Sequence, residues 1–343
     1  MNTLKETWLI TNYSCNNRCK WCYTTDKGFV NYDMPLKFAK DTLLELSKNG
    51  VKKCTLIGGE PTLYPYLKEL ISYGSQLGLF MKIVTNGVKL SDEKYLEELK
   101  KAGLSLTAIS IHGYTPEGYR QNTQTDNLHN VEKAILNCKQ KNIPFVTLTT
   151  LNRLNCNDVL DIVKYLTKLE VDNIIFNIAV PYTTKGSVDQ NVLTPQEIAD
   201  IITKYYFSSD RKKYNYGFYA SIPLCLFDKS ILKDMIDDNF LIPLSEGGCN
   251  IFEGTGFAVE PNGNIIPCCK KNTEVITNIC RNGEFLYKNS FDSFWDIVSK
   301  NLGHEAMPYP DKKCYDCSIR TQCIGGCPMF WSYYDKTLYI KGE

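Results

Sequence analysis

Apolar positions in the first two thirds of the chain follow two alternating patterns. Short runs rich in β-branched and aromatic residues, typical of buried strands, precede segments with apolar residues every three or four positions, typical of helices. The expected strands are residues 7–11, 54–57, 80–85, 106–111, 145–151 and 174–180. The expected helices are residues 36–49, 66–77, 91–102, 128–141, 158–169 and 194–206. The last helix has a clear start, with Thr194 as cap, Pro195 in the first turn and Glu197 three residues after the cap.

Six strand–helix pairs in succession predict an α/β fold with a parallel sheet and helical crossovers. Six units are fewer than the eight of a closed barrel, so we expect a partial (β/α)6 barrel over residues 1–206. Beyond about residue 214 the strands become short and cysteines frequent, and no further α/β unit is expected. We predict a bridging segment over residues 207–248, then a small Cys-rich α+β domain over residues 249–343 that metal holds together.

Charge and hydropathy exclude several classes of protein. Lys plus Arg is 39 and Asp plus Glu is 38, a net charge of +1, which argues against binding nucleic acid through bulk charge. No run approaches 18 apolar residues, so no membrane-spanning helix is expected. The polar residues 1–6 lack the pattern of a secretory signal, which predicts a cytoplasmic protein.

The cysteine content points to metal. The chain has 15 cysteines, an odd number that disulfide pairing cannot absorb, and a reducing compartment favours metal ligands. Cys15, Cys19 and Cys22 form a C-x3-C-x2-C motif directly after the first strand. Three thiolates on one loop can hold three irons of a [4Fe–4S] cubane and leave the fourth iron to a small-molecule chelator. A structural zinc site would normally have a fourth protein ligand. Zinc or three unliganded thiols are the alternatives.

This motif, with Trp21 before its third cysteine, resembles the signature of the radical S-adenosylmethionine (SAM) enzymes. The resemblance covers roughly residues 7–206. It implies a partial α/β barrel with a [4Fe–4S] cluster that binds SAM. It further implies reductive cleavage of SAM to a 5′-deoxyadenosyl radical, which abstracts a hydrogen atom from substrate.

The resemblance also implies which residues lie at SAM, all near the carboxyl ends of strands, where barrel enzymes keep their sites. They are Trp21 in the cysteine motif, Gly58, Gly59, Glu60 and Pro61 after the second strand, Thr85 and Asn86 after the third, Ser110 and His112 after the fourth, Asn152 after the fifth, and Phe176 and Ile178 on the sixth. For the last two, the backbone is expected to line the adenine. The structural alternatives are helix caps for Glu60, Asn86 and Ser110 and a solvated loop position for His112. For Asn152, both a contact to SAM and a purely structural role stay open. No catalytic residue is assigned.

The C-terminal cysteines form a second pattern. Cys249-x13-Gly263-x4-Cys268, followed by Cys314-x2-Cys317-x5-Cys323-x3-Cys327, resembles a SPASM domain, which implies one or two auxiliary [4Fe–4S] clusters. By analogy one cluster takes Cys249, Cys268 and Cys327, with Cys280 or Cys269 as the local candidates for its fourth ligand. The other takes Cys314, Cys317 and Cys323. A zinc ribbon is the alternative.

Two departures from the SPASM pattern matter. No cysteine follows Cys327, so a second auxiliary cluster is expected to have an open iron or an oxygen ligand such as Asp335, or to be missing. Cys269 stands where sulfatase-maturing relatives have an Asp that acts as base, which disfavours a sulfatase substrate. Cys225 between the domains is a filler or, less often, a hydrogen-atom donor.

The favoured function is peptide modification by crosslinking, epimerisation or oxidation, as an oxidoreductase or peptide maturase supplied with electrons by a flavodoxin or ferredoxin. The barrel starts within ten residues, so no leading recognition module is expected, and a separate peptide-recognition protein would be needed. One alternative is dehydrogenation or epimerisation of a small molecule such as a sugar, aminocyclitol or nucleoside. Another is an iron–sulfur electron-transfer or redox-sensing protein, against which residues 58–61 argue.

Overall fold

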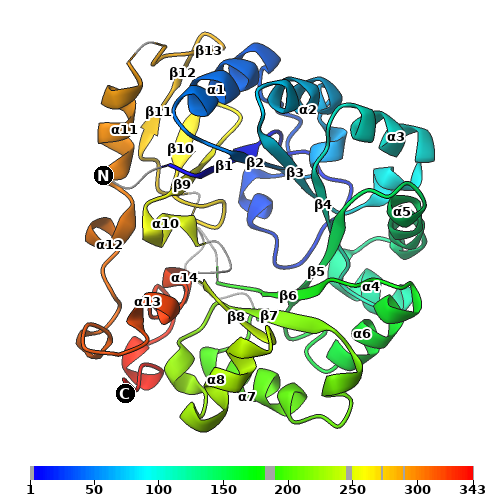
Figure 1. Cartoon of the computed structure of the whole chain (residues 1–343), viewed down its shortest axis with the longest axis vertical. Helices are drawn as coiled ribbons and strands as arrows, with labels where there is room; N and C mark the ends of the chain where they lie inside the picture. The colour runs from blue at the N-terminus through cyan, green and yellow to red at the C-terminus, as the bar shows by residue number, and fades with distance from the viewer. Residues whose placement is uncertain (1–3, 182–189, 245–248, 272, 289, 343) are drawn as a thin grey trace.

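A parallel sheet forms the centre of the molecule. The computed structural model describes residues 4–181, 190–244, 249–271, 273–288 and 290–342. Its 11-stranded sheet has the order β11-β10-β9-β1-β2-β3-β4-β5-β6-β7-β8 and curves around a central space (Figure 1). The first six strands are β1 (Glu6–Ile10), β2 (Lys53–Ile57), β3 (Phe80–Thr85), β4 (Leu106–Ser110), β5 (Phe145–Leu151) and β6 (Ile174–Ile178). All five pairings among them are parallel, which confirms the expected fold class.

Helices connect these strands and cover the outer face of the sheet (Figure 1). They are α1 (Leu36–Lys48), α2 (Leu67–Gln76), α3 (Glu93–Lys101), α4 (Pro116–Thr123), α5 (Leu128–Gln140), α6 (Val159–Lys168) and α7 (Pro195–Tyr206). Thr194 and Glu197 form the expected capping box at the start of α7. Helix α4 has no counterpart among the sequence-based expectations.

The region expected only to bridge the two domains extends the sheet instead. Strand β7 (Tyr216–Ala220) pairs in parallel with β6, and after α8 (Lys229–Asp237) strand β8 (Leu241–Pro243) pairs in parallel with β7. Aromatic packing holds this extension, since the ring centroid of Phe218 lies 5.0 Å from that of Phe176 and 5.3 Å from that of Phe240. These strands are short, so their sequence carries little periodicity.

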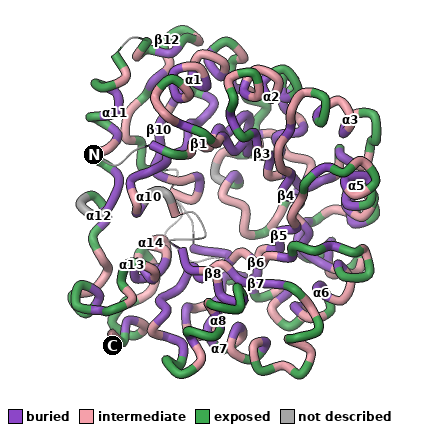
Figure 2. Tube along the Cα trace, viewed as in Figure 1, coloured by how far each residue is buried: buried purple, intermediate pink, exposed green. Residues whose placement is uncertain are grey.

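Side chains alternate between two cores. Leu9 of β1 packs outward among the helices, whereas Ile10 faces the inside of the curved sheet, where it packs with Ile57 and Cys269. Figure 2 shows the strands mostly buried and the outward faces of the helices exposed. The two-residue period of a strand places one set of residues toward the site and the other toward the structural core.

The Cys-rich region is joined to the barrel by backbone pairing. Strand β9 (Gly256–Val259) runs parallel to β1, and β10 (Asn264–Ile266) and β11 (Thr277–Asn278) continue antiparallel. Strands β12 (Cys280–Arg281) and β13 (Glu284–Phe285) form a separate pair. The helices are α10 (Asn250–Glu253), α11 (Phe291–Ser299), α12 (Gly303–Ala306), α13 (Arg320–Cys323) and α14 (Pro328–Trp331).

Short 3-10 turns complete the fold. They are η1 (Tyr23–Lys27), η2 (Pro61–Leu63), η3 (Val88–Ser91), η4 (Arg211–Lys213), η5 (Leu224–Leu226), η6 (Lys312–Cys314) and η7 (Lys336–Leu338). Within the described ranges, every helix is too short or too polar to cross a bilayer.

Candidate functional site

Three cysteines converge on the loop after β1. We call residues 12–22 the thiol loop; it carries Cys15, Cys19 and Cys22. Burial, together with the charges of Glu60 and Cys22, raises the pKa of the Cys15 thiol to about 12. Burial also raises the pKa of Cys19, followed by the charges of Cys22 and Cys15. The three thiols are therefore close enough to interact, as shared coordination requires.

The glycines after β2 let two backbone segments approach each other. The amide of Gly59 donates to the Asn12 carbonyl at 2.9 Å, and the amide of Glu60 donates to the Ser14 carbonyl at 2.7 Å. A Cβ on Gly59 would lie 2.2 Å from the Ser14 oxygen, and one on Gly58 would lie 2.5 Å from Asn12 Oδ1. Only glycine therefore fits where this turn meets the start of the thiol loop.

Glu60 ties together the ends of two strands. Its carboxylate is 1% exposed and accepts hydrogen bonds from the Thr62 amide (3.0 Å), the Thr85 hydroxyl (2.6 Å) and the Asn86 amide (2.7 Å). The Thr62 hydroxyl donates as well, at 2.6 Å. Burial raises the pKa of Glu60, whereas these hydrogen bonds act to lower it. Glu60 thus has a structural role whatever it contributes to a ligand, and Pro61 opens η2 beside it.

Asn86 connects β3 to the thiol loop. Its amide nitrogen donates to Asn16 Oδ1 at 2.6 Å and lies 3.9 Å from Cys15 Sγ. Its amide oxygen accepts from the Val88 amide at 3.1 Å. Asn86 therefore makes a local turn contact one residue before Gly87, the N-cap of η3, together with a contact to the cysteine motif.

His112 is buried rather than solvated. Its ring is 6% exposed and lies edge-on to Trp21, with centroids 4.9 Å apart. Nδ1 accepts from the Thr150 amide at 3.2 Å. Burial lowers the pKa of His112 to about 4, so the ring is neutral at pH 7 and carries its proton on Nε2. By contrast, the Ser110 hydroxyl is half-buried and makes no hydrogen bond within the part of the chain described.

The side chains of Asn152, Phe176 and Ile178 make contacts within the protein that leave none of them free for a ligand. The fully buried Asn152 amide donates to Asn122 Oδ1 and to the Thr150 carbonyl, both at 3.0 Å, and accepts from the Leu154 amide at 2.8 Å. Phe176 and Ile178 are 0% and 1% exposed and pack in the core beneath the helices. For Phe176 and Ile178, therefore, only backbone atoms could reach a ligand inside the sheet.

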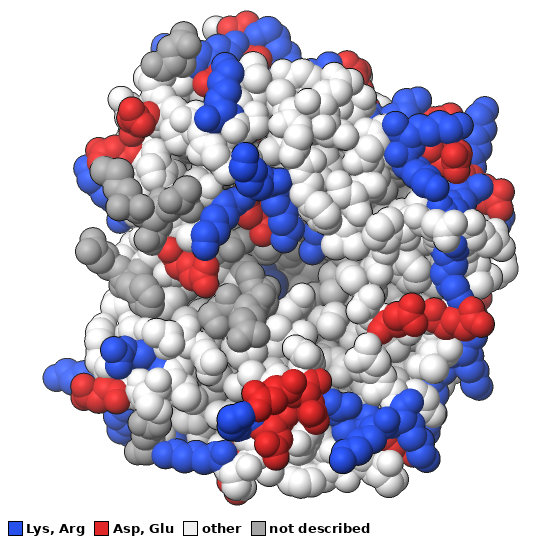
Figure 3. Space-filling view, in the orientation of Figure 1, with Lys and Arg blue, Asp and Glu red and all other residues white. Residues whose placement is uncertain are grey.

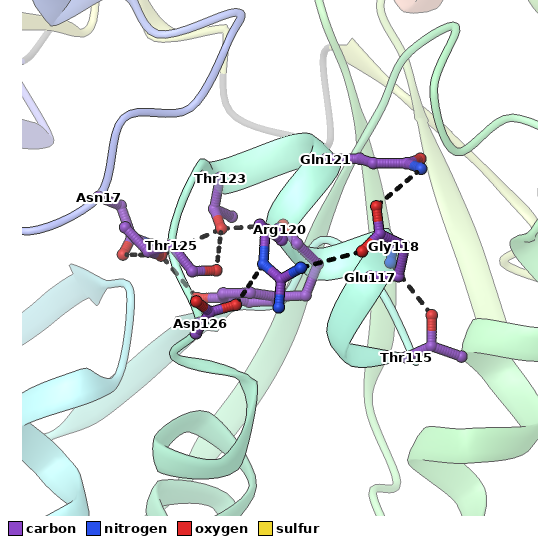
Figure 4. A network of polar contacts seen from close by, with 10 residues as sticks. Asn17, Thr115, Glu117, Gly118, Arg120, Gln121, Thr123, Thr125 and Asp126 are labelled. Atoms are coloured by element: carbon purple, nitrogen blue, oxygen red, sulfur yellow. Dashed lines mark hydrogen bonds and ion pairs between the residues drawn. The ribbon is translucent and has the colours of Figure 1, made fainter.

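Helix α4 holds the thiol loop from the other side, and the sequence analysis missed it. The Asn17 amide donates to the Tyr119 hydroxyl at 3.2 Å, and the Thr125 hydroxyl donates to Asn17 Oδ1 at 3.0 Å (Figure 4). The Arg18 amide donates to the Thr123 carbonyl at 2.9 Å. The available signal was Thr115 followed by Pro116, a capped helix start whose hydroxyl accepts from the Gly118 amide.

Three C-terminal thiols form a first auxiliary group. Burial raises the pKa of Cys249 to about 12, followed by the charge of Cys327 and, more weakly, that of Cys268. Burial likewise raises the pKa of Cys327, which the positive charge of Lys270 opposes. Lys270 therefore lies near these three thiols, Cys249, Cys268 and Cys327, which the SPASM pattern assigned to one cluster.

Neither candidate for a fourth ligand joins this group clearly. Cys280 lies at the turn end of the β9–β10 hairpin, where a Cβ added to Gly263 would be 2.1 Å from the Cβ of Cys280. Cys268, by contrast, follows the opposite end of β10. Cys280 is therefore separated from Cys268 by the length of β10, and its role as a ligand stays a prediction. Cys269 is 5% exposed and packs inside the sheet with Ile10. Hydrogen bonding between the adjacent thiols raises the pKa of Cys269 and lowers that of Cys268.

The other three cysteines of the SPASM pattern, together with Cys225, form a second auxiliary group. Cys314, Cys317 and Cys323 line one pocket, and Cys225 lines it with them. In the described residues no three His, Cys, Asp or Glu side chains lie close enough to hold a single metal ion. A cubane spreads its thiolates over several irons, so these looser groups suit an iron–sulfur cluster better than a zinc ribbon.

The comparisons with known proteins agree with this geometry. Residues 9–166 match the model of the radical SAM superfamily. The chain is 30% identical over 199 residues to 7,8-dihydro-6-hydroxymethylpterin dimethyltransferase of Methanocaldococcus jannaschii, which covers 55% of this chain and 39% of that protein. It is 27% identical over 221 residues to Fe-coproporphyrin III synthase of Methanosarcina barkeri, which covers 63% of this chain and 53% of that protein. The chain thus spans about half the length of these curated relatives.

Among solved structures the likeness of fold covers nearly the whole chain. SuiB of Streptococcus suis bound to S-adenosylmethionine has a TM-score of 0.70 at 16% identity, over 98% of this chain and 77% of that one. SuiB bound to its precursor peptide SuiA has a TM-score of 0.69 at 17% identity, over 99% and 74%. The protein anSMEcpe, with AdoMet and the Kp18Cys peptide, has a TM-score of 0.66 at 19% identity, over 95% and 90%.

Motif, site and fold lead to one family. The thiol loop and the glycine turn both lie within the matched region, at the carboxyl end of the parallel sheet. The likeness of fold continues through the Cys-rich region, where β9 extends the barrel sheet. Residues 9–166 therefore form a radical SAM domain, and the chain as a whole, including its Cys-rich region, shares the fold of SuiB and anSMEcpe.

Proposed function

We propose that this protein is a radical SAM enzyme that modifies a peptide, as an oxidoreductase or peptide maturase. The observation that carries the proposal is the convergence of Cys15, Cys19 and Cys22 beside the turn at Gly58 and Gly59. A [4Fe–4S] cluster held by these three thiols would supply the electron for cleavage of SAM to methionine and a 5′-deoxyadenosyl radical, the species that would abstract a hydrogen atom from substrate.

The chain's own residues prepare this place. Three thiols satisfy three corners of a cubane and leave one for the amino and carboxylate groups of SAM. The glycine turn packs its bare backbone directly against the start of the thiol loop, which holds residues 58–61 close to the cysteines. Glu60 and Asn86 keep the ends of β2 and β3 against that loop, and the Ser110 hydroxyl is available to a ligand.

The surroundings suit radical chemistry. Tyr13, Ile10 and Ile57 pack inside the sheet together with Cys269, an apolar surface that excludes water from a reactive species. His112 is held neutral by burial, so it adds no charge beside Trp21. Cys269 in place of an acidic base also disfavours the sulfatase-maturing reaction.

An open cavity beside the thiol loop offers a route for substrate. Arg18, Lys20, Phe29, Gln124 and Asn191 are among the residues that line it. Figure 3 shows a hollow near the centre of the molecule in that view, with Lys and Arg side chains above it. A peptide suits this cavity because the guanidinium of Arg18 and the side-chain amides of Gln124 and Asn191 can donate hydrogen bonds to backbone carbonyls.

The peptide assignment draws on the fold, since SuiB was solved with a precursor peptide and anSMEcpe with the Kp18Cys peptide. A small-molecule substrate is the second candidate, because the pterin dimethyltransferase relative is named for a small molecule. Electrons would come from a flavodoxin or ferredoxin. An electron-transfer protein without SAM chemistry is disfavoured, because it would have no use for the glycine turn beside the thiols.

The decisive test is anaerobic reconstitution with iron and sulfide, followed by dithionite and SAM. Release of 5′-deoxyadenosine and methionine is expected, and none is expected after Cys19→Ala. A loaded, folded protein that leaves SAM intact would overturn the proposal. Genes next to the coding sequence distinguish the substrates: a short open reading frame favours a peptide, whereas sugar- or amine-modifying genes favour a small molecule.

A further inference from the structure

The second auxiliary group contains a cysteine that the SPASM pattern does not supply. Cys225 follows β7, far in sequence from Cys314, Cys317 and Cys323, yet all four thiols line the same pocket. Pro223, Ile319, Arg320, Gly325, Ile340 and Gly342 line the rest of it. No carboxylate or imidazole is found among these lining residues, so thiolates are its anionic donors.

Direct packing fixes Cys225 in this place. The Leu224 amide donates to Cys323 Sγ at 3.1 Å, and the Cys327 amide donates to the Ser221 carbonyl at 2.8 Å. A Cβ on Gly326 would lie 2.9 Å from Pro223 Cδ, so the two segments touch through their backbones. Turn η5, which carries Cys225, is therefore held against the turn that carries Cys323.

Asp335, the oxygen donor suggested by the sequence, is not positioned to bind a cluster in this pocket. Asp335 is exposed and caps η7, where its carboxylate accepts from the Thr337 amide at 2.9 Å and the Thr337 hydroxyl at 2.7 Å. It does not line the pocket. Among the residues that line this pocket, the candidate anionic donors are therefore the four cysteines.

We propose that Cys225 is the fourth ligand of a second auxiliary [4Fe–4S] cluster, with Cys314, Cys317 and Cys323. It takes the place of the last cysteine of the SPASM pattern, which residues 328–343 do not supply. Each thiol loses its proton on ligation, and the oxidation state of the sulfur does not change. This inference rests on the proposed radical SAM function and on the auxiliary clusters that the SPASM pattern implies. A cluster with four protein ligands passes electrons and has no free iron to anchor a substrate.

Iron content tests the assignment in the full-length, reconstituted protein. The unaltered chain is expected to hold about twelve irons, or three cubanes, and Cys225→Ala about four fewer, as for Cys317→Ala. Cys156→Ala is the matched control, since Cys156 is also half-buried and directs its thiol to the Arg153 carbonyl at 3.6 Å. EPR spectra of the reduced Cys225→Ala protein should lose one component or show a cluster lacking one iron. Wild-type iron and spectra in Cys225→Ala would overturn the proposal.

Alkylation of the unaltered chain answers the same question without a variant that could misfold. Anaerobic iodoacetamide labelling, read by mass spectrometry, should modify Cys225 before reconstitution and spare it afterwards, together with Cys317. Cys156 should be labelled equally in both. Equal labelling of Cys225 in both states, or about eight irons with Cys225 still reactive, would refute the assignment. Release of 5′-deoxyadenosine in that same sample would leave the proposed function standing.

Discussion

The ammonium of Lys27 lies 2.8 Å from the carboxylate of Glu260, so an ion pair joins the turn after the thiol loop to the β9–β10 hairpin. Glu260 is 1% exposed and also accepts from the Tyr13 hydroxyl and the Asn264 amide, each at 3.0 Å. One buried carboxylate thus fastens the segments on both sides of the cysteine motif to the C-terminal domain. Nothing in the spacing of the sequence predicted this contact.

Glu260→Gln should lower the free energy of unfolding by about 1–3 kcal/mol, because a buried acceptor of three donors loses its charge. Denaturant unfolding of the protein measures the change. Glu284→Gln is the matched control, since its carboxylate also lies 2.8 Å from a lysine, Lys37, but on the exposed surface. That control should change stability very little. Equal losses in the two variants would contradict the special role of Glu260.

Glu60→Ala should weaken folding as well as SAM binding, because four donors from Thr62, Thr85 and Asn86 lose their acceptor inside the protein. Buried donors without partners cost about 1–3 kcal/mol. Thr62→Val, which removes one of those hydroxyl donors, should be milder. Unfolding curves and SAM titration of the cluster-loaded protein measure both effects. Unchanged stability with at least tenfold weaker SAM binding would make Glu60 a ligand contact alone.

Replacing Cys15, Cys19 and Cys22 together by Ala should remove about four irons and abolish SAM cleavage while leaving C-terminal iron bound. The reason is that the auxiliary thiols gather in two other places, one with Cys249 and one with Cys314. Iron analysis and product release measure the two effects separately. Loss of all iron from a folded triple variant would show that the C-terminal thiols hold no cluster of their own.

Stability should fall as pH drops from about 6.5 toward 4, because burial lowers the pKa of His112 to about 4 from its ordinary 6.5. In that window the unfolded chain binds the proton and the folded chain does not, so the slope approaches about 1.4 kcal/mol per pH unit. Below pH 4 this contribution levels off.

Denaturant unfolding at several pH values, compared between the unaltered chain and His112→Asn, isolates this histidine. The Asn side chain can still accept from the Thr150 amide but does not titrate. His129→Asn is the control, because His129 is exposed on α5. The pH slope should shrink in the first variant and persist in the second. An unchanged slope in His112→Asn would contradict the burial argument.

The sequence alone determined the features that depend on local order. Strand and helix periodicity predicted the alternating fold from β1 to α7, and the capping signature placed the start of α7. The spacing of Cys15, Cys19 and Cys22 indicated one shared site. Such patterns arise because a strand repeats every two residues and a helix about every 3.6, so neighbours in sequence report them directly.

Tertiary structure decided which distant residues meet. It set Glu60 among four donors, buried His112 against Trp21, and paired Lys27 with Glu260. Within the segment expected to bridge the domains, it formed strands β7 and β8, which extend the sheet. It also placed Cys225 in one pocket with the thiols of the second auxiliary group. These contacts join segments far apart along the chain. They depend on the curvature of the sheet and the packing of η5 against α13, which no local spacing of residues encodes.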